Sequence, residues 1–287
     1  KIKRLTGTAR ISAQGEVTVS DGPDAGTYQA DKILIASGSE PASLPGIEID
    51  ENKIVSSTGA LSLPQVPKKL VVIGAGYIGL EMGTVWSRLG AEVEVIEFLP
   101  RILPGMDQEV ASKFKTLLEK QGINFQLSTA VKSAKSSAKG VTLRVADADG
   151  GNEREISCDI ALVSVGRKPA TAALGLDELG VALTDRGQIA VDEDFETNIE
   201  GIFAIGDVIE GPMLAHKAEE DGVAAVEIMA GHAGHVDYDA VPGIVYTAPE
   251  IATLGKTEEA IKDAGIYYNK GVLHLIANRR AKAIGHT

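Results

Sequence analysis

The sequence has 287 residues, of which 44% are apolar, 24% charged and 4% aromatic, a composition typical of a globular protein rather than a disordered or collagen-like chain. Asp and Glu outnumber Lys and Arg by 40 to 28, and the net charge of −12 argues against nucleic acid or a membrane surface as a partner. Cys158 is the lone cysteine, so the chain contains no internal disulfide and no dithiol redox pair.

Both ends of the sequence suggest an internal piece of a longer protein, although a natural chain with ragged ends is the alternative. The chain starts at Lys1 rather than Met, with no signal or transit pattern, and ends without a helix or capping signal. No apolar run is long enough for a transmembrane helix. A motif that is missing from such a piece is therefore no evidence that the parent protein lacks the corresponding function.

The first part of the chain predicts short strands. Thr8 to Ile11 and Glu16 to Val19 are rich in β-branched residues, a turn cluster follows at 21–24, and 32–36 contains the apolar run of a buried strand. Prolines then interrupt a stretch with little periodicity. We expect residues 1–66 to form the first portion of one domain.

From Leu70 the pattern changes to alternating strands and helices. A continuous apolar run predicts a strand at 70–73, and further strands are expected at 92–96 and 123–127. A helix between the first two strands ends at Gly90, and a second begins after the N-cap Asp107 and ends at Gly122. The inward side chains expected for the first helix are Ile78, Met82, Val85, Trp86 and Leu89. The alternation predicts a right-handed parallel α/β unit.

The remaining elements are predicted from similar patterns. A hairpin is expected at 141–145 and 153–157, followed by strands at 160–165, 189–191 and 201–205. A helix is expected at 213–230 with Leu214, Ala218, Val226 and Met229 inward. After Pro242, strands at 244–246 and 273–276 flank a helix at 257–264. We expect domain segments at 67–187, 188–239 and 240–287.

The glycine motif between the first strand and helix of the α/β unit carries the clearest chemistry. Gly74 allows a tight turn, Gly76 lets a pyrophosphate approach the backbone, and Gly79 lets the helix lie close to the sheet. The N–H groups at the start of that helix suit a pyrophosphate. The spacing therefore predicts a dinucleotide-binding loop, the alternative being glycines that serve packing alone.

An acidic residue lies at the position expected after a dinucleotide-binding glycine loop. Glu97 ends the next strand about 20 residues after Gly76, in position to accept hydrogen bonds from ribose hydroxyls. A 2′-phosphate would lie beside that carboxylate, so the sequence favours NAD over NADP. Arg101 lies four residues further and is either a counter-charge that softens this preference or a surface residue.

A second glycine and acid pair ends the strand at 201–205. Asp207 follows Gly206 at the carboxyl edge of that strand, where open α/β sheets bind ligands. The alternative role for Asp207 is to stabilise a turn.

Together these motifs resemble the flavoprotein disulfide reductases, the class I pyridine nucleotide-disulfide oxidoreductases. The resemblance rests on Gly74–Gly79, Gly201–Asp207 and Ser37–Ser39, and the segments at 97–107, 165–169, 211–219 and 246–250 look like the dihydrolipoamide dehydrogenase branch. It implies an α/β fold of Rossmann-like, doubly wound FAD/NAD(P)-binding domains. Each would have a three-layer ββα arrangement, and the start of an α+β dimerisation domain would follow.

The resemblance also implies cofactor contacts. On the NAD side the expected residues are those of the glycine loop and others assigned by the family pattern, namely Gly74, Ala75, Gly76, Tyr77, Ile78, Gly79, Glu81, Glu97, Val131 and Gly166. On the FAD side they are Ala9, Ser37, Gly38, Ser39, Asp207, Met213, Leu214, Ala215 and His216. Asp207 would bond the ribityl chain, and the backbone of Met213–His216 would face the flavin's pyrimidine edge.

Departures from the family pattern restrict the expected activity. The chain lacks the redox cysteine pair, the first FAD phosphate loop and the catalytic His-Glu pair, so no catalytic residue is assigned. His232 and His235 have a metal-like spacing, but their glycine-rich surroundings argue against zinc. Cys158 is expected to be an inert core thiol.

The resemblance implies a flavoprotein that oxidises dihydrolipoyl groups of 2-oxo acid dehydrogenase complexes with FAD and NAD. The implied partners are the dihydrolipoyl domain and a second copy in a homodimer, and the expected compartment is the cytoplasm, with the mitochondrial matrix as the alternative. Two other functions stay open. One is a relative with another acceptor, such as an NADH oxidase, mercuric reductase or transhydrogenase, and the other is a nucleotide-binding fragment without catalysis.

Overall fold

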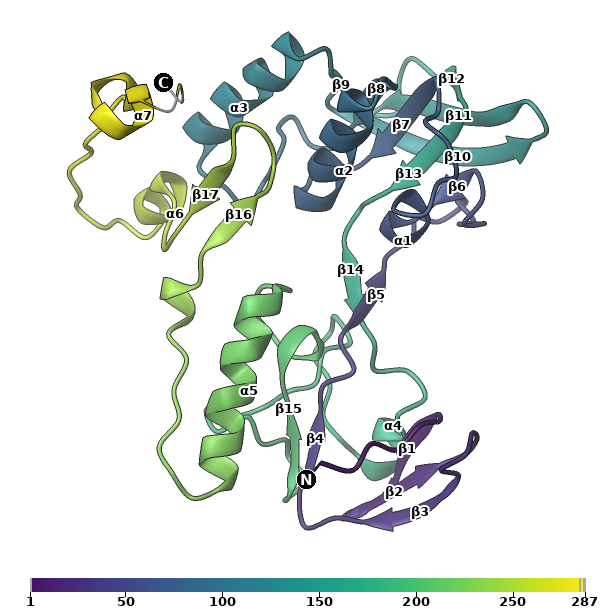
Figure 1. Ribbon diagram of the computed structural model, residues 1–287, viewed down its shortest axis with the longest axis vertical. Helices are drawn as coiled ribbons and strands as arrows, with labels where there is room; N and C mark the ends of the chain where they lie inside the picture. The colour runs from purple at the N-terminus through teal and green to yellow at the C-terminus, as the bar shows by residue number, and fades with distance from the viewer. Residues whose placement is uncertain (1, 284, 286–287) are drawn as a thin grey trace.

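The computed structural model describes residues 2–283 and 285 and has two lobes joined by a narrow ribbon (Figure 1). The upper lobe in this view is built on a five-stranded parallel sheet of order β6-β13-β7-β8-β9. Its strands are β6 Ile54–Val55, β7 Lys69–Ile73, β8 Glu92–Ile96, β9 Asn124–Gln126 and β13 Ile160–Val163. β7 and β13 are mostly continuous apolar runs because both faces of the sheet are covered there, whereas β8 alternates glutamate with apolar residues.

The upper lobe has three layers. One face of the parallel sheet packs against α1 Ser57–Ala60, α2 Tyr77–Arg88 and α3 Gln108–Lys120. The other face packs against the antiparallel sheet of β10 Thr129–Ser137, β11 Gly140–Asp147 and β12 Arg154–Cys158. Alternate residues of β7 serve the two cores, with Val72 facing the helices and Val71 facing β11. These layers confirm the predicted three-layer α/β fold.

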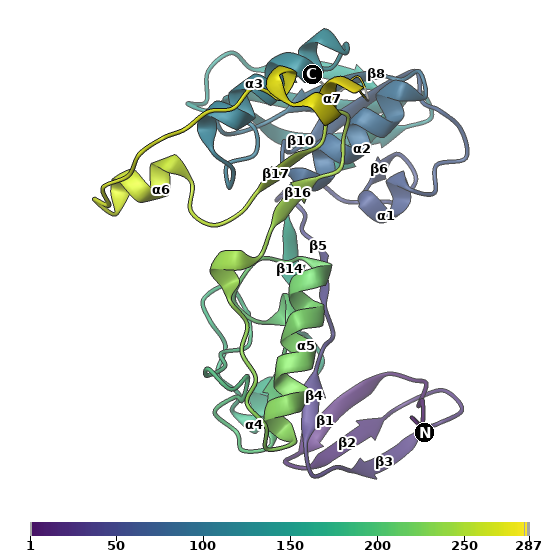
Figure 2. The same cartoon turned by 60° about the vertical axis from the view of Figure 1, so that its left-hand side comes forward.

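The lower lobe combines a short parallel pair with a separate antiparallel sheet. β4 Ile33–Ile35 pairs with β15 Ile202–Ala204, and α5 Ala215–Met229 lies beside them (Figure 2). The antiparallel strands are β1 Ala9–Ala13, β2 Glu16–Val19 and β3 Gly26–Gln29, near α4 Leu176–Leu179. One apolar core unites these elements across more than 200 residues of sequence.

Two connections run between the lobes. β5 Ser39–Pro41 and β14 Arg167–Pro169 pair antiparallel in the ribbon. After η1 Gly206–Val208 and α5, the chain returns through η2 Tyr238–Ala240 to the upper lobe. There it forms β16 Gly243–Val245, β17 Ile251–Thr253, α6 Glu258–Asp263, η3 Leu275–Ala277 and α7 Arg279–Ala283.

The local capping predictions are confirmed. The Asp107 carboxylate accepts hydrogen bonds from the backbone N–H of Glu109 at 2.9 Å and of Val110 at 3.4 Å, so it caps α3. At the other end, Gly122 follows the helix with φ +94°, a conformation that glycine adopts without strain.

Several predicted elements differ from the structure. The strand expected at 273–276 is wrong, because Leu275–Ala277 is an exposed 3₁₀ turn with no strand beside it. The strand expected at 189–191 reduces to one isolated bridge from Ile189 to Leu183. Sequence analysis also missed β3 and the Lys- and Ser-rich β10, which are held by pairing with neighbouring strands rather than by apolar periodicity.

The inward faces predicted for two helices are correct at Trp86, Met82 and Met229, which pack in or against the cores, and wrong at three other positions. Val85 and Leu89 of α2 are 45% and 57% exposed, and Val226 of α5 is 55% exposed. The buried face of α2 instead includes Gly79 and Gly83, because glycine lets the helix axis approach the sheet.

Within the described part of the chain, every helix is too short or too polar to span a lipid bilayer.

Candidate functional site

The glycine loop joins the carboxyl end of β7 to the start of α2. Gly74 has φ +103°, and a Cβ there would lie 2.5 Å from the carbonyl oxygen of Ser164. A Cβ on Gly79 would lie 2.2 Å from the carbonyl oxygen of Gly74. Both positions therefore exclude any larger residue for steric reasons.

Gly76 differs from the other two glycines. It is the N-cap of α2 with φ −81°, has no side-chain cap, and a Cβ built on it meets nothing within 4 Å. Neither backbone strain nor packing in the chain therefore requires glycine here. An open face at a helix N-terminus fits the approach of an anion such as a pyrophosphate.

Glu97 lies at the same sheet edge as the glycine loop. Its carboxylate accepts a hydrogen bond from the backbone N–H of Ala75 at 2.7 Å and another from Leu99 at 2.8 Å. The parallel pairing of β7 with β8 brings these residues together. Arg101 is turned away, because its guanidinium donates to the carbonyl oxygens of Leu103 and Met106 in its own loop.

Near the start of α2, the C-terminal segment covers part of the helix surface that does not pack on the sheet. The Glu81 carboxylate accepts a hydrogen bond from the backbone N–H of Tyr246 at 2.8 Å. Tyr77 is half-buried, and its hydroxyl lies 3.0 Å from where a Cβ of Gly243 would stand. Burial raises the pKa of Tyr77. Tyr77 and Glu81 thus lie together on this face with Ile78 between them in sequence, and the Glu81 carboxylate already has a partner within the chain.

Val131 and Gly166 occupy different environments. Val131 is in β10 and packs against the core on the antiparallel side of the sheet, next to a bulge. Gly166 is exposed just before β14, has φ +123°, and a Cβ there would meet nothing within 4 Å. Its carbonyl oxygen accepts the N–H of Ala42, which ties it to the ribbon.

The ribbon carries a polar cluster between the lobes. Ser39 donates its hydroxyl to the carboxylate of Asp207 at 2.5 Å. The guanidinium of Arg167 donates to the hydroxyl and to the carbonyl oxygen of Ser39, each at 2.6 Å. Ser37 donates to the carbonyl oxygen of Ala170 at 2.8 Å. Three segments far apart in sequence thus meet around Ser39.

Gly38 has φ +74° and open space where a Cβ would stand. Ala9 is exposed in β1, paired with Val19, in the sheet at the end of the lower lobe away from the ribbon (Figure 1). It is therefore not among the residues gathered around Asp207.

The start of α5 offers backbone donors rather than side chains. The helix begins at Ala215 with Leu214 as N-cap and no side-chain capping bond. The ring Nε2 of His216 lies 2.8 Å from the carbonyl oxygen of Pro242, so that nitrogen is engaged in the chain. Met213 and Leu214 are partly buried in front of the helix.

Sequence analysis assigned no role to four residues near these groups. They are Arg167, which the Val165–Pro169 segment contained, and Lys217, Asp221 and Tyr238. Lys217 and Asp221 form a buried ion pair behind the Gly206–Asp207 turn, and the more exposed Tyr238 donates to Asp221. The i, i+4 spacing of Lys217 and Asp221 was the available signal. Cys158 is buried as expected, and burial raises its thiol pKa to about 11, which keeps it an unreactive thiol.

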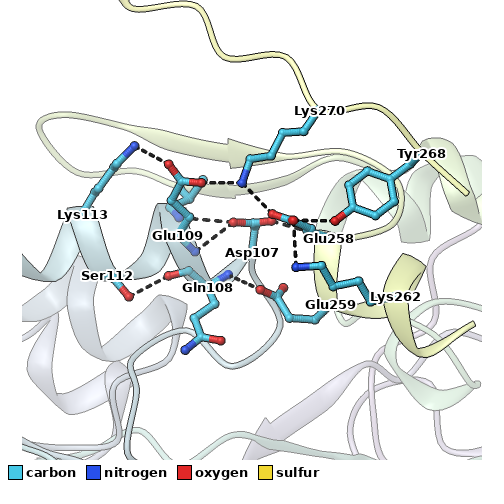
Figure 3. A network of polar contacts seen from close by, with 11 residues as sticks. Asp107, Gln108, Glu109, Ser112, Lys113, Glu258, Glu259, Lys262, Tyr268 and Lys270 are labelled. Atoms are coloured by element: carbon cyan, nitrogen blue, oxygen red, sulfur yellow. Dashed lines mark hydrogen bonds and ion pairs between the residues drawn. The ribbon is translucent and has the colours of Figure 1, made fainter. Parts of the chain in front are cut away.

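A polar network fastens the C-terminal segment to the start of α3 (Figure 3). Asp107 accepts from the N–H of Glu258 at 3.3 Å, and Glu259 accepts from the N–H of Gln108 at 3.2 Å. Lys270 joins the two elements, with its Nζ 2.5 Å from Glu109 and 2.6 Å from Glu258. The carboxylates near each helix start therefore satisfy N–H groups of both helices.

This network predicts an acid-sensitive attachment. Hydrogen bonds from Lys113 and Lys270 lower the pKa of Glu109 to about 2, and those from Lys262, Lys270 and Tyr268 lower that of Glu258 to about 2. A lowered folded-state pKa stabilises the docked state above the ordinary carboxyl pKa, and this stabilisation is lost as pH falls toward the lowered value.

We therefore expect the hydrogen-bonded amides within residues 258–266 to be protected from hydrogen exchange at about pH 6 and to lose protection, after correction for intrinsic rates, toward about pH 3. Lys270→Met should loosen them already at neutral pH. The matched control is Lys115→Met, which removes another lysine paired with a glutamate on α3. A pH-independent attachment would contradict the role of these carboxylates.

Comparison with known proteins agrees with this geometry. Residues 1–222 match the pyridine nucleotide-disulphide oxidoreductase family, and residues 241–287 match its dimerisation domain. Over 285 residues the chain is 54% identical to a mitochondrial dihydrolipoyl dehydrogenase of Pisum sativum, covering 99% of this chain and 57% of the relative. The human mitochondrial enzyme is 49% identical over 291 residues, covering 100% and 57%.

Other relatives carry different names. A leghemoglobin reductase of Vigna unguiculata is 55% identical, covering 99% of this chain and 54% of the relative. The solved structure of LpdA from Mycobacterium tuberculosis matches with a TM-score of 0.87 and 27% identity, covering 98% of this chain and 62% of that one. The chain spans little more than half the length of its curated relatives.

The family matches cover most of the chain, and the glycine loop, the acid at the end of β8 and the three-layer lobe agree with them. FAD and NAD are the cofactors of this family. The chain belongs to the pyridine nucleotide-disulphide oxidoreductases.

Proposed function

We propose that the whole protein is an FAD- and NAD-dependent dihydrolipoyl dehydrogenase that oxidises dihydrolipoyl groups of 2-oxo acid dehydrogenase complexes. In this proposal electrons pass from the dihydrolipoyl group through a cysteine pair and FAD to NAD⁺, and the cofactors supply the redox chemistry. This chain provides the NAD site and part of the FAD site. The cysteine pair and the His-Glu pair are absent from its sequence.

The observation that carries the proposal is the contact between Glu97 and the glycine loop. The Glu97 carboxylate lies 2.7 Å from the backbone nitrogen of Ala75, beside the open face of Gly76. In this arrangement the N-terminus of α2 holds a pyrophosphate while Glu97 accepts the hydroxyls of the adjoining ribose. A carboxylate at that position selects NAD over NADP. Gly166 closes over the dinucleotide, and Val131 contacts its adenosine.

In the same proposal, Tyr77 and Ile78 line the nicotinamide side of the flavin, and Glu81 contacts the carboxamide group of the nicotinamide. The Glu81 carboxylate has acceptor sites left beyond the bond that it accepts from the Tyr246 N–H at 2.8 Å.

The residues around the ribbon fit the polar portions of FAD. Asp207 has acceptor sites left after the bond from Ser39, and we assign them to the ribityl hydroxyls. The backbone N–H groups of Met213, Ala215 and His216 and the positive end of the α5 dipole stabilise the negative charge of a reduced flavin, while the N–H of Leu214 donates to the carbonyl oxygen of Pro212 at 3.0 Å. Ser37 and Gly38 line the same side. Ala9 is the weakest member of this set, because its strand lies away from the ribbon.

The proposed domain division comes from the sequence pattern. Residues 1–66 and 188–239 form the FAD-binding portion, 67–187 the NAD-binding domain and 240–287 the start of the dimer-interface domain. The separate cores of the two lobes support two bodies but favour other boundaries, because residues 44–63 pack in the upper lobe and residues 174–181 in the lower lobe. The dimerisation match at 241–287 and the exposed apolar side chains of Leu273 and Ile276 support a homodimer.

A second candidate is a reductase with another electron acceptor. The relatives named leghemoglobin reductase, at 55% and 53% identity, support it. NADH oxidase, mercuric reductase and transhydrogenase belong to the same candidate. Reduction of NAD by the intact protein with dihydrolipoamide as donor distinguishes the first candidate from these, and its absence would remove the first.

The compartment follows from the named relatives. Those from Pisum sativum and Homo sapiens are called mitochondrial. We therefore assign the protein to the mitochondrial matrix, in place of the cytoplasm expected first.

The NAD site can be tested on this chain directly. We expect NAD to bind about tenfold more tightly than NADP, or better, because a 2′-phosphate would meet the Glu97 carboxylate. Isothermal titration calorimetry with both dinucleotides measures the ratio. Equal affinities would contradict the assignment of Glu97.

The chain by itself is expected to show no lipoamide turnover, because one cysteine cannot form the redox pair. Measurable turnover by the purified chain would refute this, and intact protein serves as the positive control. A visible spectrum of the same sample reports whether flavin is retained.

A further inference from the structure

The first two turns of α5 contain a buried ion pair that points at the turn before Asp207. Lys217 and Asp221 are both 0% exposed, and their Nζ and Oδ2 atoms are 2.7 Å apart. The same two atoms reach one residue of the neighbouring turn. Lys217 Nζ donates to the carbonyl oxygen of Gly206 at 3.1 Å, and Gly206 N–H donates to Asp221 Oδ2 at 3.0 Å.

Gly206 is therefore held at both of its backbone polar groups. Its φ is +73°, and a Cβ would lie 3.1 Å from the Cβ of Ala218, so the helix surface touches the turn. The next residue is Asp207, whose carboxylate meets the hydroxyl of Ser39. Any rotation of the Gly206–Asp207 peptide would move that carboxylate away from the ribbon.

Tyr238 closes the group on its outer side. Its hydroxyl donates to Asp221 Oδ1 at 2.8 Å, and Lys217 Nζ lies 5.5 Å from its ring centroid. Burial and the bond to Asp221 raise the pKa of Tyr238, so the hydroxyl stays a donor. Both carboxylate oxygens of Asp221 thus have donors, and its charge is matched by one lysine.

Energetics argue that this pair serves position rather than stability. Removing two charges from water costs roughly as much as their attraction returns, and apolar residues of similar size often stabilise a core equally well. Stability alone therefore does not require an ion pair here. Apolar side chains, however, offer nothing to the N–H and C=O of Gly206.

We propose that Lys217 and Asp221 are positioning residues that fix the Gly206–Asp207 turn and hold the Asp207 carboxylate against Ser39, with Tyr238 securing Asp221. The inference rests on the proposed function in one respect, that Asp207 then meets the ribityl chain of FAD. We call the hydrogen bonds from Lys217 and Asp221 to Gly206 the clamp, and these bonds are present in the chain without cofactor.

The test is a comparison of amide exchange rates within one lobe of the chain. Lys217→Met removes the donor to the Gly206 carbonyl and leaves Asp221 with its two donors. We expect the amides of Gly206 and Asp207 to exchange about tenfold faster, as for loss of one bond to a charged group, while the amide of Ala204 in β15 changes little. The matched control is Lys115→Met on α3.

A second variant keeps the test decisive if Lys217→Met folds poorly. Tyr238 is 42% exposed, so Tyr238→Phe should fold and give the same local pattern at smaller amplitude. The Asp207 carboxyl ¹³C resonance should shift in both variants and stay unchanged in the control. Equal acceleration of all three amides would show that the pair only stabilises the lobe, and no acceleration would also overturn the clamp.

Flavin binding separates this inference from the proposed function. Where the unaltered chain takes up FAD, its affinity, read from quenching of flavin fluorescence, should fall about tenfold in Lys217→Met but not in the control. Unchanged affinity alongside a loosened turn would overturn the positioning role toward flavin. Failure of the intact protein to bind FAD would contradict the proposed function, while the exchange pattern and the Asp207 resonance still decide the clamp.

Discussion

Gly76→Ala is expected to weaken NAD binding at least about tenfold while the chain keeps its fold. The reason is that the new Cβ meets no atom of the chain within 4 Å but occupies the face where we propose that the pyrophosphate lies. Gly76 has an ordinary φ of −81°, so the substitution introduces no backbone strain. An alanine N-cap should cost about 1 kcal/mol or less. Calorimetry with NAD and a thermal melt measure the two effects separately.

Gly79→Ala is the matched comparison in the same motif. Its Cβ would lie 2.2 Å from the Gly74 carbonyl oxygen and 2.6 Å from Ser164 Oγ, contacts that force the backbone to move. Overpacking of this kind costs about 1–3 kcal/mol and lowers the melting temperature by several degrees. If the two alanine variants behaved alike in melting, the division of roles between these glycines would be wrong.

Glu97→Ala is expected to narrow the preference for NAD over NADP. Removing the carboxylate takes away the acceptor for the ribose hydroxyls and also the charge that opposes a 2′-phosphate, so NAD loses affinity and NADP gains it. Arg101 cannot easily replace that interaction, because its guanidinium is engaged with the carbonyl oxygens of its own loop. The ratio of the two dissociation constants measures the effect.

Glu97 also holds its own loop, which sets the control. The variant leaves the N–H groups of Ala75 and Leu99 without their carboxylate partner, and an unsatisfied buried donor costs about 1–3 kcal/mol. Glu97→Gln keeps an acceptor oxygen and lacks the charge. We expect it to melt closer to the unaltered chain than Glu97→Ala and still to narrow the nucleotide preference. An unchanged ratio in both variants would exclude Glu97 from nucleotide selection.

The two candidate sites stand at the two ends of the β5–β14 ribbon. Gly166 begins the ribbon beside the upper lobe, and Ser39 joins it to the Gly206–Asp207 turn of the lower lobe through Asp207. Arg167 lies between them and bonds Ser39 twice. The ribbon therefore positions the groups proposed for NAD and those proposed for FAD relative to one another.

The parallel α/β unit and its glycine loop were predictable from sequence because their signals are local. An apolar run marks β7, Asp107 caps α3 through residues two and three positions away, and Gly74 is required by a turn between adjacent elements. Glu97 could be assigned because parallel strands of known order end at the same sheet edge. None of these inferences relates residues more than about 20 positions apart in the sequence.

Contacts between distant segments were decided by the tertiary structure. Ser39, Arg167 and Asp207 come from three parts of the chain, and no periodicity relates them. The same holds for Tyr246 on Glu81 and for the buried face of α2, which includes two glycines, while Val85 and Leu89 are exposed. Apolar patterning fixes which elements form, but the packing of whole layers selects the faces that meet, because burial depends on neighbours that the local sequence does not contain.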